Sequence, residues 1–333
     1  MPRKSLDDLR DLATRVLVAA GTTTGTSAMV ADALVRADAD GLASHGVMRL
    51  PSYAGQARAG KVDGRAEPEL TETGSAAIRV DARDGFAYPA IRLGLERAAG
   101  MVAGAGSVSV AIGNSHHAGV VGHHVEDLAE QGLAALGFTN SPAAIAPAGG
   151  GRAIFGTNPI AFACPRRNSP PIVIDTSLSR VARGRVKLAA DRGEPIPDTW
   201  AVDAEGNPTT DASAAMQGAM LPIGGAKGSA LVLMVELLCA ALTGSNAGFQ
   251  ASSFFDAEGP PPGIGQFYVV FRPDAFDGGG FSDRVEDIAG AITGQSGARL
   301  PGSRRLEMRS RAAAEGAEVP EELYGELERL AAE

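Results

Sequence analysis

The chain has little cysteine: only Cys164 and Cys239 occur among its 333 residues, and both stand in apolar surroundings. Two cysteines so far apart in the sequence indicate neither a disulfide framework nor a cysteine-based metal site. We expect both thiols to be buried, because free cysteine is among the most buried residue types.

Lysine, basic charge and long apolar runs are also scarce. Acidic residues exceed Lys and Arg, 39 against 30, which gives a net charge of −9. This balance argues against a nucleic-acid-coating protein, because phosphate backbones are bound by clustered basic residues. No apolar run approaches the roughly 18 residues of a membrane helix, and the chain starts with an amphipathic helix instead of a secretory apolar segment. We therefore expect a cytoplasmic protein without nucleic-acid or membrane partners.

Helical patterns occupy both ends of the chain. Leucines at helical spacing follow Ser5, which forms a capping-box pattern with Asp8, and a second helix is expected from Ser27. Helices are also predicted over residues 281–292 and 320–330. Since both ends are helical, we expect the termini to pack together around an inserted sheet domain.

The middle of the chain alternates short strands with helices. Apolar runs bounded by Gly, Pro and Asn predict strands over residues 107–113, 133–138, 160–163, 171–174 and 266–271. Helical patterns lie over residues 88–102, 120–131, 179–190 and 227–242. The predicted fold class is α/β (α+β), with a sheet domain over residues 71–280 and a helical domain built from 1–70 and 281–333.

Histidine is the side chain that exchanges protons most readily near neutral pH. The chain has five of them, His45 alone and then His116, His117, His123 and His124. His45 follows Ser44 and precedes Arg49 by four residues. It is either a turn residue bonded to the backbone, or a proton donor oriented by Ser44 beside an Arg49 that clamps a substrate carboxylate.

The second histidine group begins where the strand over 107–113 ends. A metal site is one hypothesis, since His117 and His124 stand seven residues apart and could share a helix face, but no further ligands are recognisable. The other hypothesis is that Gly119 and the amides of the following helix bind a phosphate or pyrophosphate. The sequence leaves both open.

The common nucleotide-binding motifs are absent. Residues 104–106 lack the third glycine of a dinucleotide fingerprint and follow a helix instead of a strand. Lys227 opens a helix after two glycines, and it is either a surface residue or a phosphate ligand. Asp175 and Ser177 follow a strand, where N-capping of the next helix is the simpler interpretation. The arginines within residues 299–305 are either a solvated charge run or a phosphate site.

Six segments share their residues and order with a known family. They are Ser44-His45-Gly46 with Arg49 and Pro51, then residues 114–117, 155–159, 175–177, 225–228 through Glu236, and 300–302. Together they resemble the malate/L-lactate dehydrogenase family of NAD(P)-dependent oxidoreductases, whose cofactor domain is not a Rossmann fold. The family includes ureidoglycolate, sulfolactate and diketogulonate dehydrogenases and the piperideine-2-carboxylate and pyrroline-2-carboxylate reductases. The match runs from about residue 5 to 330.

The resemblance implies a role for each matched position. His45 would be the proton donor, Ser44 its relay partner, and Arg49 and Thr157 would contact the substrate. The dinucleotide would lie against His117, Ala118, Gly119, Val120, Val121, Asp175, Thr176, Ser177, Ala226, Lys227, Gly302, Ser303 and Arg304. A homodimer is also implied, with the active site between the helical and sheet domains.

The implied reaction is hydride transfer between a nicotinamide and C2 of a small 2-hydroxy or 2-oxo acid of the malate, lactate or sulfolactate type. The family's cyclic-imine reductases carry an acidic relay residue where this chain has Arg185, which favours a 2-hydroxy acid. Residues 228–231 and Arg304-Arg305 resemble the reductase branch, so cyclic-imine reduction stays the alternative. A histidine-rich metal-binding protein is the alternative from another class.

Two further expectations concern the identity of the coenzyme and the protonation state of His45. Arg299, Arg304 and Arg305 favour NADP through its 2′-phosphate, without excluding NAD. Both protonation states of His45 are accessible near pH 7 if its pKa stays near about 6.5.

Overall fold

Alternating apolar residues form one seven-stranded mixed sheet in the order β2-β3-β4-β10-β5-β6-β7. Only β3 and β4 run parallel, and the other neighbouring pairs are antiparallel. The strands are β2 (Glu69–Gly74), β3 (Ala77–Asp81), β4 (Ser107–Ser115), β5 (Ala134–Thr139), β6 (Ile160–Cys164), β7 (Ile172–Thr176) and β10 (Ile264–Phe271). This computed structural model describes residues 3–333; residues 1 and 2, with which the expected helical domain begins, lie outside the described part.

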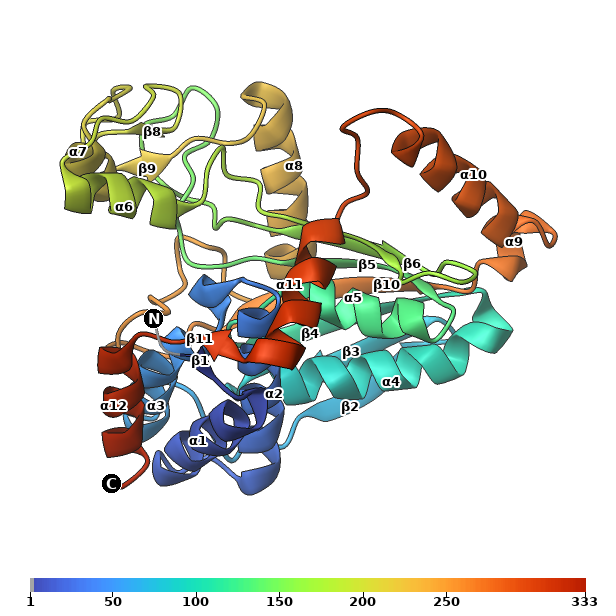
Figure 1. Ribbon diagram of the computed structural model, residues 1–333, viewed down its shortest axis with the longest axis horizontal. Coiled ribbons are helices and arrows are strands. Elements are labelled where there is room, and N and C mark those ends of the chain that lie inside the picture. Colours follow the sequence, from blue (N-terminus) through green and yellow to red (C-terminus); the bar gives the residue numbers. More distant parts are fainter. Residues whose placement is uncertain (1–2) are drawn as a thin grey trace.

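Helices cover both faces of the sheet (Figure 1). One face packs against α4 (Ala87–Ala105) and α5 (Val121–Glu130) through a core of mostly aliphatic side chains. The other face packs against α8 (Ala226–Glu236) and its π-helical continuation (Leu237–Ala241). The sheet is therefore the middle of three layers.

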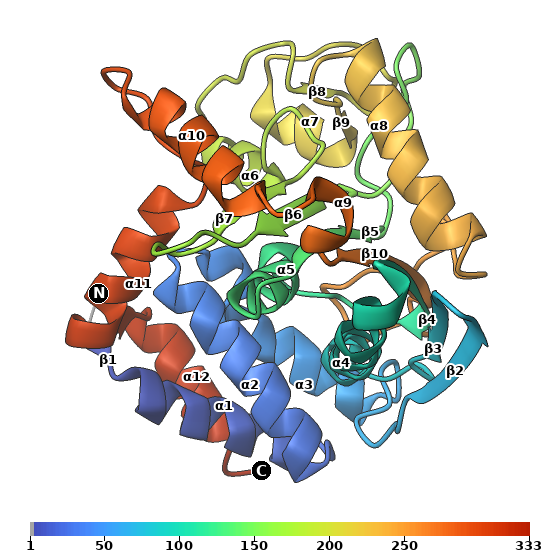
Figure 2. The same ribbon diagram turned by 90° about the vertical axis from the view of Figure 1, so that its right-hand side faces the viewer.

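The N-terminal helices form a separate apolar cluster with the end of the chain. It joins α1 (Leu6–Ala19), α2 (Thr24–Ala39), α3 (Leu50–Arg58) and α12 (Glu321–Leu330). A two-stranded pairing of β1 (Arg3–Lys4) with β11 (Ala317–Glu318) joins the termini directly. Figure 2 shows this group below the sheet. The expected packing of the two termini is confirmed.

The C-terminal helices divide between the two parts. Val285 of α10 (Phe281–Thr293) packs with Cys164 and Ala134 of the strands. In contrast, α11 (Ser303–Glu315) lies along α2. The division of the chain into a helical domain (residues 1–70 and 281–333) and a sheet domain (residues 71–280) stays a prediction.

Several local predictions can be compared with the structure. The Ser5 hydroxyl accepts the Asp8 amide at 3.0 Å, as the capping pattern predicted, and both cysteines are buried. The helix expected over 179–190 is α6, which begins later and spans Arg183–Arg192. The pattern analysis did not delimit α3, α11, β2 or β3. The remaining short elements are α7 (Ala212–Gln217), α9 (Asp274–Asp277), β8 (Ala201–Val202) and β9 (Ala219–Met220).

Within residues 3–333, no helix combines the length and the apolar character that crossing a bilayer requires.

Candidate active site

Two short 3-10 helices, Ala43–His45 and Val47–Arg49, connect α2 to α3. Gly46 separates them, and a β-carbon at this position would collide with the carboxylate of Asp38. That carboxylate accepts the backbone hydrogen of the residue after Gly46 at 2.8 Å. The turn that carries His45 is therefore fixed from α2.

His45 lies where the N-terminal helices meet the sheet. Its Nδ1 atom is 3.0 Å from the Ser44 hydroxyl, and its ring stacks on that of His117 with centroids 5.4 Å apart. His117 belongs to the segment that follows β4, and its Nδ1 atom lies 2.6 Å from the buried Tyr53 hydroxyl of α3. The expected pairing of an N-terminal imidazole with the sheet domain is present.

Arg49 presents a guanidinium that the protein only partly satisfies. Its Nε donates to the carbonyl of Ser44 at 2.7 Å. Its Nη1 is buried and has no hydrogen-bond partner within residues 3–333. Leaving a buried charged donor unpaired costs free energy, so a ligand carboxylate is the natural acceptor.

The environment of His45 favours its neutral form. Desolvation, with the positive charges of Arg49 and then His123, lowers the pKa of His45 to about 4. The condition for both protonation states to be accessible near pH 7, a pKa near about 6.5, is therefore not met, because burial disfavours the charged ring and the Arg49 cation adds to this effect. At pH 7 His45 is an acceptor of protons.

The other histidines do not converge on one point. Three of them bond to three separate acceptors: His116 to Gln56 Oε1 at 2.7 Å, His123 to Asp40 Oδ2 at 2.8 Å, and His124 to the Ala118 carbonyl at 2.9 Å. His117 precedes α5, so the suggestion that it shares a helix face with His124 is wrong. In the part of the chain that the structure describes, no three or more His, Cys, Asp and Glu side chains gather as metal ligands do.

Two helices that carry expected coenzyme residues are preceded by a residue whose side chain makes no capping hydrogen bond. These are α5, which follows Val120, and α11, which follows Gly302. Uncapped first-turn amides bind phosphate groups, with which the positive end of the helix dipole also interacts favourably. The start of α11 therefore fits a phosphate group of a dinucleotide, whereas in α5 the Asp175 carboxylate already accepts the first-turn amide of Gly122.

The end of β7 brings these two helices together. Asp175 accepts the amide hydrogen of Gly122 in α5 at 2.8 Å. On the other side, a β-carbon at Gly302 would lie 3.2 Å from the Val173 carbonyl. The end of β7 thus lies beside the first turn of α5 on one side and beside Gly302 on the other, and the coenzyme contacts that the resemblance implied there stay a prediction.

The N-capping interpretation of Asp175 and Ser177 is wrong. Helix α6 begins six residues after Ser177, and no side chain caps it. The Ser177 hydroxyl instead lies 2.8 Å from that of Ser179, while the Asp175 carboxylate is bonded to α5. Both side chains therefore shape the loop beside the expected coenzyme site.

Backbone hydrogen bonds connect Thr157 to the segment that precedes α8, the helix that carries Lys227. The Thr157 carbonyl accepts the Leu178 amide at 2.9 Å, and the Leu178 carbonyl accepts the Ile223 amide at 2.9 Å. These bonds place the start of α8 near the end of β7. Lys227 is exposed in the first turn of α8, and within residues 3–333 no hydrogen bond joins it or Ala226 to the group around His45.

Asn158 explains why two of the matched segments belong together. It adopts φ +40°, and its side-chain amide donates to Glu236 at 2.7 Å and to the Val232 carbonyl at 3.1 Å. The buried Glu236 also accepts the Gly248 amide at 2.6 Å. Residues 155–159 are therefore held against α8.

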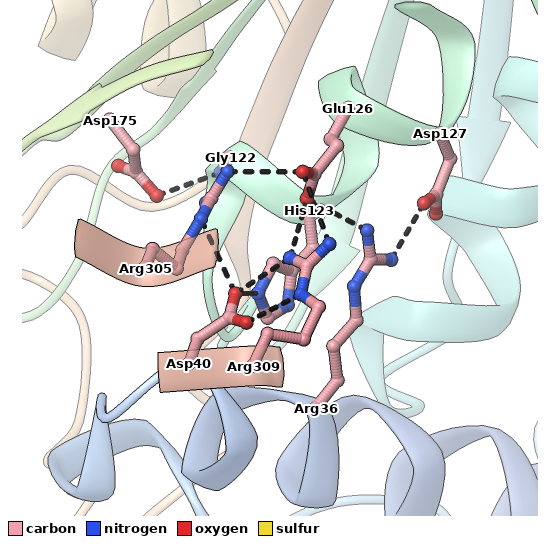
Figure 3. A network of polar contacts seen from close by, with 9 residues as sticks. All are labelled: Arg36, Asp40, Gly122, His123, Glu126, Asp127, Asp175, Arg305 and Arg309. Carbon is pink, nitrogen blue, oxygen red and sulfur yellow. Dashed lines mark hydrogen bonds and ion pairs between the residues drawn. The ribbon is translucent and has the colours of Figure 1, made fainter. Parts of the chain in front are cut away.

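A buried network of charges joins α2, α5 and α11 behind the expected coenzyme site (Figure 3). Arg309 donates to both oxygens of Asp40, at 2.7 and 2.8 Å, and to Glu126 at 2.9 Å. Arg36 reaches Glu126 at 2.9 Å from α2. The network fixes the position of α5 relative to the N-terminal helices.

The network also engages Arg305, which the sequence assigned to a 2′-phosphate. Its nitrogens lie 3.3 Å from carboxylate oxygens of both Asp40 and Glu126. The assignment is wrong for Arg305, because two buried carboxylates already compensate its charge. Arg304 is exposed at the start of α11 and keeps the role that the resemblance implied.

Sequence reasoning missed the residues that support the site. Tyr53, Asp40, Glu126 and Arg309 stand in no recognisable motif, and their partners are distant in the chain. Only hydrophobic spacing could have placed Tyr53, by assigning residues 50–58 to a helix.

The site suits the combined transfer of a hydride and a proton to a small carboxylate compound, which is the chemistry of an oxidoreductase. The chain belongs to the malate/L-lactate dehydrogenase family, whose sequence profile matches residues 5–328.

Individual relatives cover nearly the whole chain. One relative is the (2R)-3-sulfolactate dehydrogenase (NADP(+)) of Chromohalobacter salexigens. It is 52% identical over 327 residues, which span 98% of this chain and 97% of the relative. Another relative is the Δ1-pyrroline-2-carboxylate/Δ1-piperideine-2-carboxylate reductase of Pseudomonas aeruginosa. It is 42% identical over 330 residues, which span 98% of each chain. The crystal structure of Δ1-piperideine-2-carboxylate reductase from Pseudomonas syringae superposes with a TM-score of 0.93 at 39% identity, covering 99% of this chain and 100% of that one.

These findings confirm the predicted family and fold class and the prediction of an oxidoreductase.

The charge network generates a stability prediction. Burial alone would raise the pKa of Asp40, but the hydrogen bonds from Arg309 and His123 lower this pKa from 3.8 to about 2. The ionised carboxylate therefore stabilises the fold above pH 3.8, and this contribution is lost as the pH falls through about 2. We expect Asp40→Asn to lower the free energy of unfolding by about 2–4 kcal/mol at pH 7.

At pH 3 the difference in free energy of unfolding between Asp40→Asn and the parent should shrink to about half. At this pH the carboxyl group is mostly protonated in the unfolded chain, so that its ionisation contributes less to the stability of the fold. Urea unfolding at both pH values measures it. Asp127→Asn is the matched control, because Asp127 pairs with Arg36 at the exposed edge of the network and should cost under about 1 kcal/mol. An Asp40→Asn protein as stable as the parent at pH 7 would contradict the assignment.

Proposed function

We propose that the protein transfers hydride between NADP and C2 of a small 2-hydroxy or 2-oxo acid, with His45 moving the proton. One observation supports this above all others. The imidazole of His45 stacks on His117 of the sheet domain, and both His45 and Arg49, whose Nη1 has no partner within residues 3–333, bond to Ser44.

The residues divide the reaction between them. Arg49 holds the substrate carboxylate with paired hydrogen bonds, and this orients C2. In the oxidation direction the neutral His45 accepts the hydroxyl proton. In the reduction direction the protonated His45 donates to the oxygen on which negative charge develops. A bound nicotinamide supplies or accepts the hydride.

Substrate binding prepares His45 for reduction. The charge of Arg49 is one cause of the lowered pKa of His45. A carboxylate bound to Arg49 compensates that charge, so the pKa of His45 rises when an anionic substrate is present. The imidazolium is then formed where it is used.

NADP is the proposed coenzyme. The start of α11, which has no side-chain cap at Gly302, offers backbone amides to its phosphates, and Arg304 is exposed in the first turn of α11 for a 2′-phosphate. The name of the relative from Chromohalobacter salexigens also specifies NADP(+). NAD is the alternative.

A 2-hydroxy acid is the preferred substrate class. Arg185 occupies the position of the acidic relay residue of the cyclic-imine reductases, and its guanidinium lies over the Trp200 ring, 5.1 Å from the centroid. The sulfolactate dehydrogenase is 52% identical, compared with 42% for the imine reductase from Pseudomonas aeruginosa. Reduction of a cyclic imine carboxylate is the second candidate, supported by that relative and by the structural likeness to the Pseudomonas syringae enzyme.

The experiment is a kinetic comparison of the parent with His45→Ala. Malate, lactate, sulfolactate, ureidoglycolate and piperideine-2-carboxylate are each assayed with NADP and NAD coenzymes in the appropriate direction. We expect turnover of the best hydroxy acid to fall by about 10²–10⁴ in His45→Ala, because general acid-base catalysis is lost. NADPH binding, measured by fluorescence, should be retained. Unchanged turnover would remove His45 from the mechanism, and activity confined to the imine would select the second candidate.

We also propose that the protein is a homodimer. The outer face of α8 and its continuation exposes Leu233, Met234, Leu237 and Leu242, with exposed fractions of 45%, 39%, 54% and 58%. Apolar side chains gathered on one face of a helix are typical of a subunit interface. The expected cytoplasmic location stays a prediction.

The dimer is tested by light scattering of Leu237→Glu. We expect the parent to have about twice the chain mass of 33.9 kDa and the variant to have the single mass, because a carboxylate is poorly tolerated in an apolar interface. Ile288→Glu on α10, where Ile288 is 61% exposed, is the matched control and should stay dimeric. A parent protein of single mass would reject this proposal.

A further inference from the structure

A loop of the sheet domain, residues 252–258, is fastened to α3. The fastening centres on Lys61, which is almost completely buried although it carries a charge. Its ammonium donates to the Asp256 carbonyl at 3.1 Å, the Asp256 carboxylate at 3.0 Å and the Glu258 carbonyl at 2.5 Å. All three donor positions of the ammonium are used on this loop.

Two residues of α3 add further bonds to the same loop. Gln56 donates to the Asp256 carbonyl at 2.9 Å, and Ser52 donates to the Phe255 carbonyl at 3.3 Å. The loop also bonds to itself, since the Ser253 hydroxyl accepts the Phe255 amide at 3.0 Å. The backbone is therefore held on both sides of Phe255.

The fastened loop places two aromatic rings at the active site. Phe254 is buried, and its ring centroid lies 5.1 Å from that of His117 and 5.3 Å from that of His116. Phe255 is 68% exposed, yet its ring centroid lies 4.7 Å from the guanidinium carbon of Arg49. This separation is within the range of a cation–π interaction.

Burial does not explain where Phe255 lies. A ring with two thirds of its surface in water gains little from the hydrophobic effect at this position. The buried cation and the α3 side chains determine the position of its backbone instead. The same helix that follows Arg49 holds the loop that covers Arg49.

We propose that Phe255 is a positioning residue for Arg49, held over the guanidinium by the Lys61 contacts. Stacking limits rotation of the guanidinium plane, so that the unpaired Nη1 stays directed at the substrate carboxylate. The proposal rests on the proposed role of Arg49 in carboxylate binding. Phe255 itself makes no bond to the reacting atoms.

The test is a series at position 255: Phe255→Tyr, Phe255→Leu and Phe255→Ala. Removing the π face should raise the KM of the carboxylate substrate by about 3- to 10-fold in the Leu and Ala variants, the magnitude of a partly exposed cation–π contact. The Tyr variant should keep the parent KM, since it retains the π face. NADPH affinity should not change in any of the three.

Phe276→Ala is the matched control. Phe276 is 67% exposed, on α9, and its aromatic contact is with Phe271 at the opposite end of the strands from the site. This variant should behave as the parent. A Leu variant with the parent KM would overturn the proposal, and so would a Tyr variant as impaired as Ala.

A double-mutant cycle with Arg49→Gln separates this proposal from the proposed function. If Phe255 acts through the guanidinium, Phe255→Ala should add no further increase in KM once Arg49 is replaced. An increase of the same size in both backgrounds would reject the positioning role while leaving Arg49 as the carboxylate ligand. If Arg49→Gln itself leaves KM unchanged, the proposed function of Arg49 fails first.

Lys61→Met and Asp256→Ala test whether the Lys61 contacts position the loop. The Asp256 side chain is half-exposed, so its replacement should leave the fold intact. Each variant should raise the KM in the same direction as Phe255→Ala and show no additivity with it. Thermal unfolding identifies a Lys61→Met protein that fails to fold, in which case Asp256→Ala decides the outcome. Full additivity with Phe255→Ala would show that the loop contacts do not act through Phe255.

Discussion

The stacking of His45 on His117 is the contact on which the site depends, because the two rings come from the two parts of the molecule. His45 follows α2 in the helical cluster, while His117 follows β4 of the sheet. Neither part alone presents both an imidazole with its arginine and the residues expected to bind the coenzyme. The structure holds this junction from two sides: the Asp40, Glu126 and Arg309 network joins α2 to α5, and the Lys61 contacts join α3 to the loop before β10. Both contacts are ionic, and each contains buried charge: Asp40 and Glu126 in the first, and Lys61, whose partner Asp256 is half-exposed, in the second. Separating a buried charge from its partner is strongly destabilising.

The charged groups around the junction also determine which proton states are present. Desolvation lowers the pKa of His116 to about 3 and of His124 to about 4, so these rings act as neutral hydrogen-bonding groups that hold α3 and the loop before α5. The pKa of His45 is lowered as well, but His45 is partly exposed, and no hydrogen bond within the described residues uses its second ring nitrogen. A neutral, partly exposed imidazole beside a permanent cation is suited to accept a proton, and it becomes a donor only when an anion compensates the cation.

The sequence predicted those features that depend on local patterns. Capping at Ser5, the apolar strands and the amphipathic terminal helices follow from spacing over a few residues, and the structure confirms them. The six matched segments predicted that Ser44, His45 and Arg49 lie with the loop that follows β4, and the stacking of His45 on His117 agrees with this. Their expected grouping with the loop that follows β7 stays a prediction. What local patterns did not provide depends on contacts between distant residues. Arg305 is chemically suited to a phosphate, and only the fold shows that Asp40, 265 positions away, already pairs with it. The pKa of His45 likewise depends on burial by other elements, which its neighbours in the sequence do not reveal.

The position of α3 links the selection of substrate to the chemistry. Arg49 precedes this helix, Tyr53 contacts His117 from its middle, and Gln56 contacts His116 from its last turn. The helix therefore aligns the proposed carboxylate ligand with the rings that line the expected nicotinamide side. Rotation of α3 would move the guanidinium and the His117 contact together, because a helix transmits displacement as a rigid unit along its short length. In the proposed function, carboxylate recognition by Arg49 and proton transfer by His45 are therefore not independent. A substrate that fails to engage Arg49 leaves the charge of this guanidinium uncompensated, which keeps the pKa of His45 lowered. Such a compound is then both poorly oriented for hydride transfer and faced with an imidazole in the wrong protonation state for reduction.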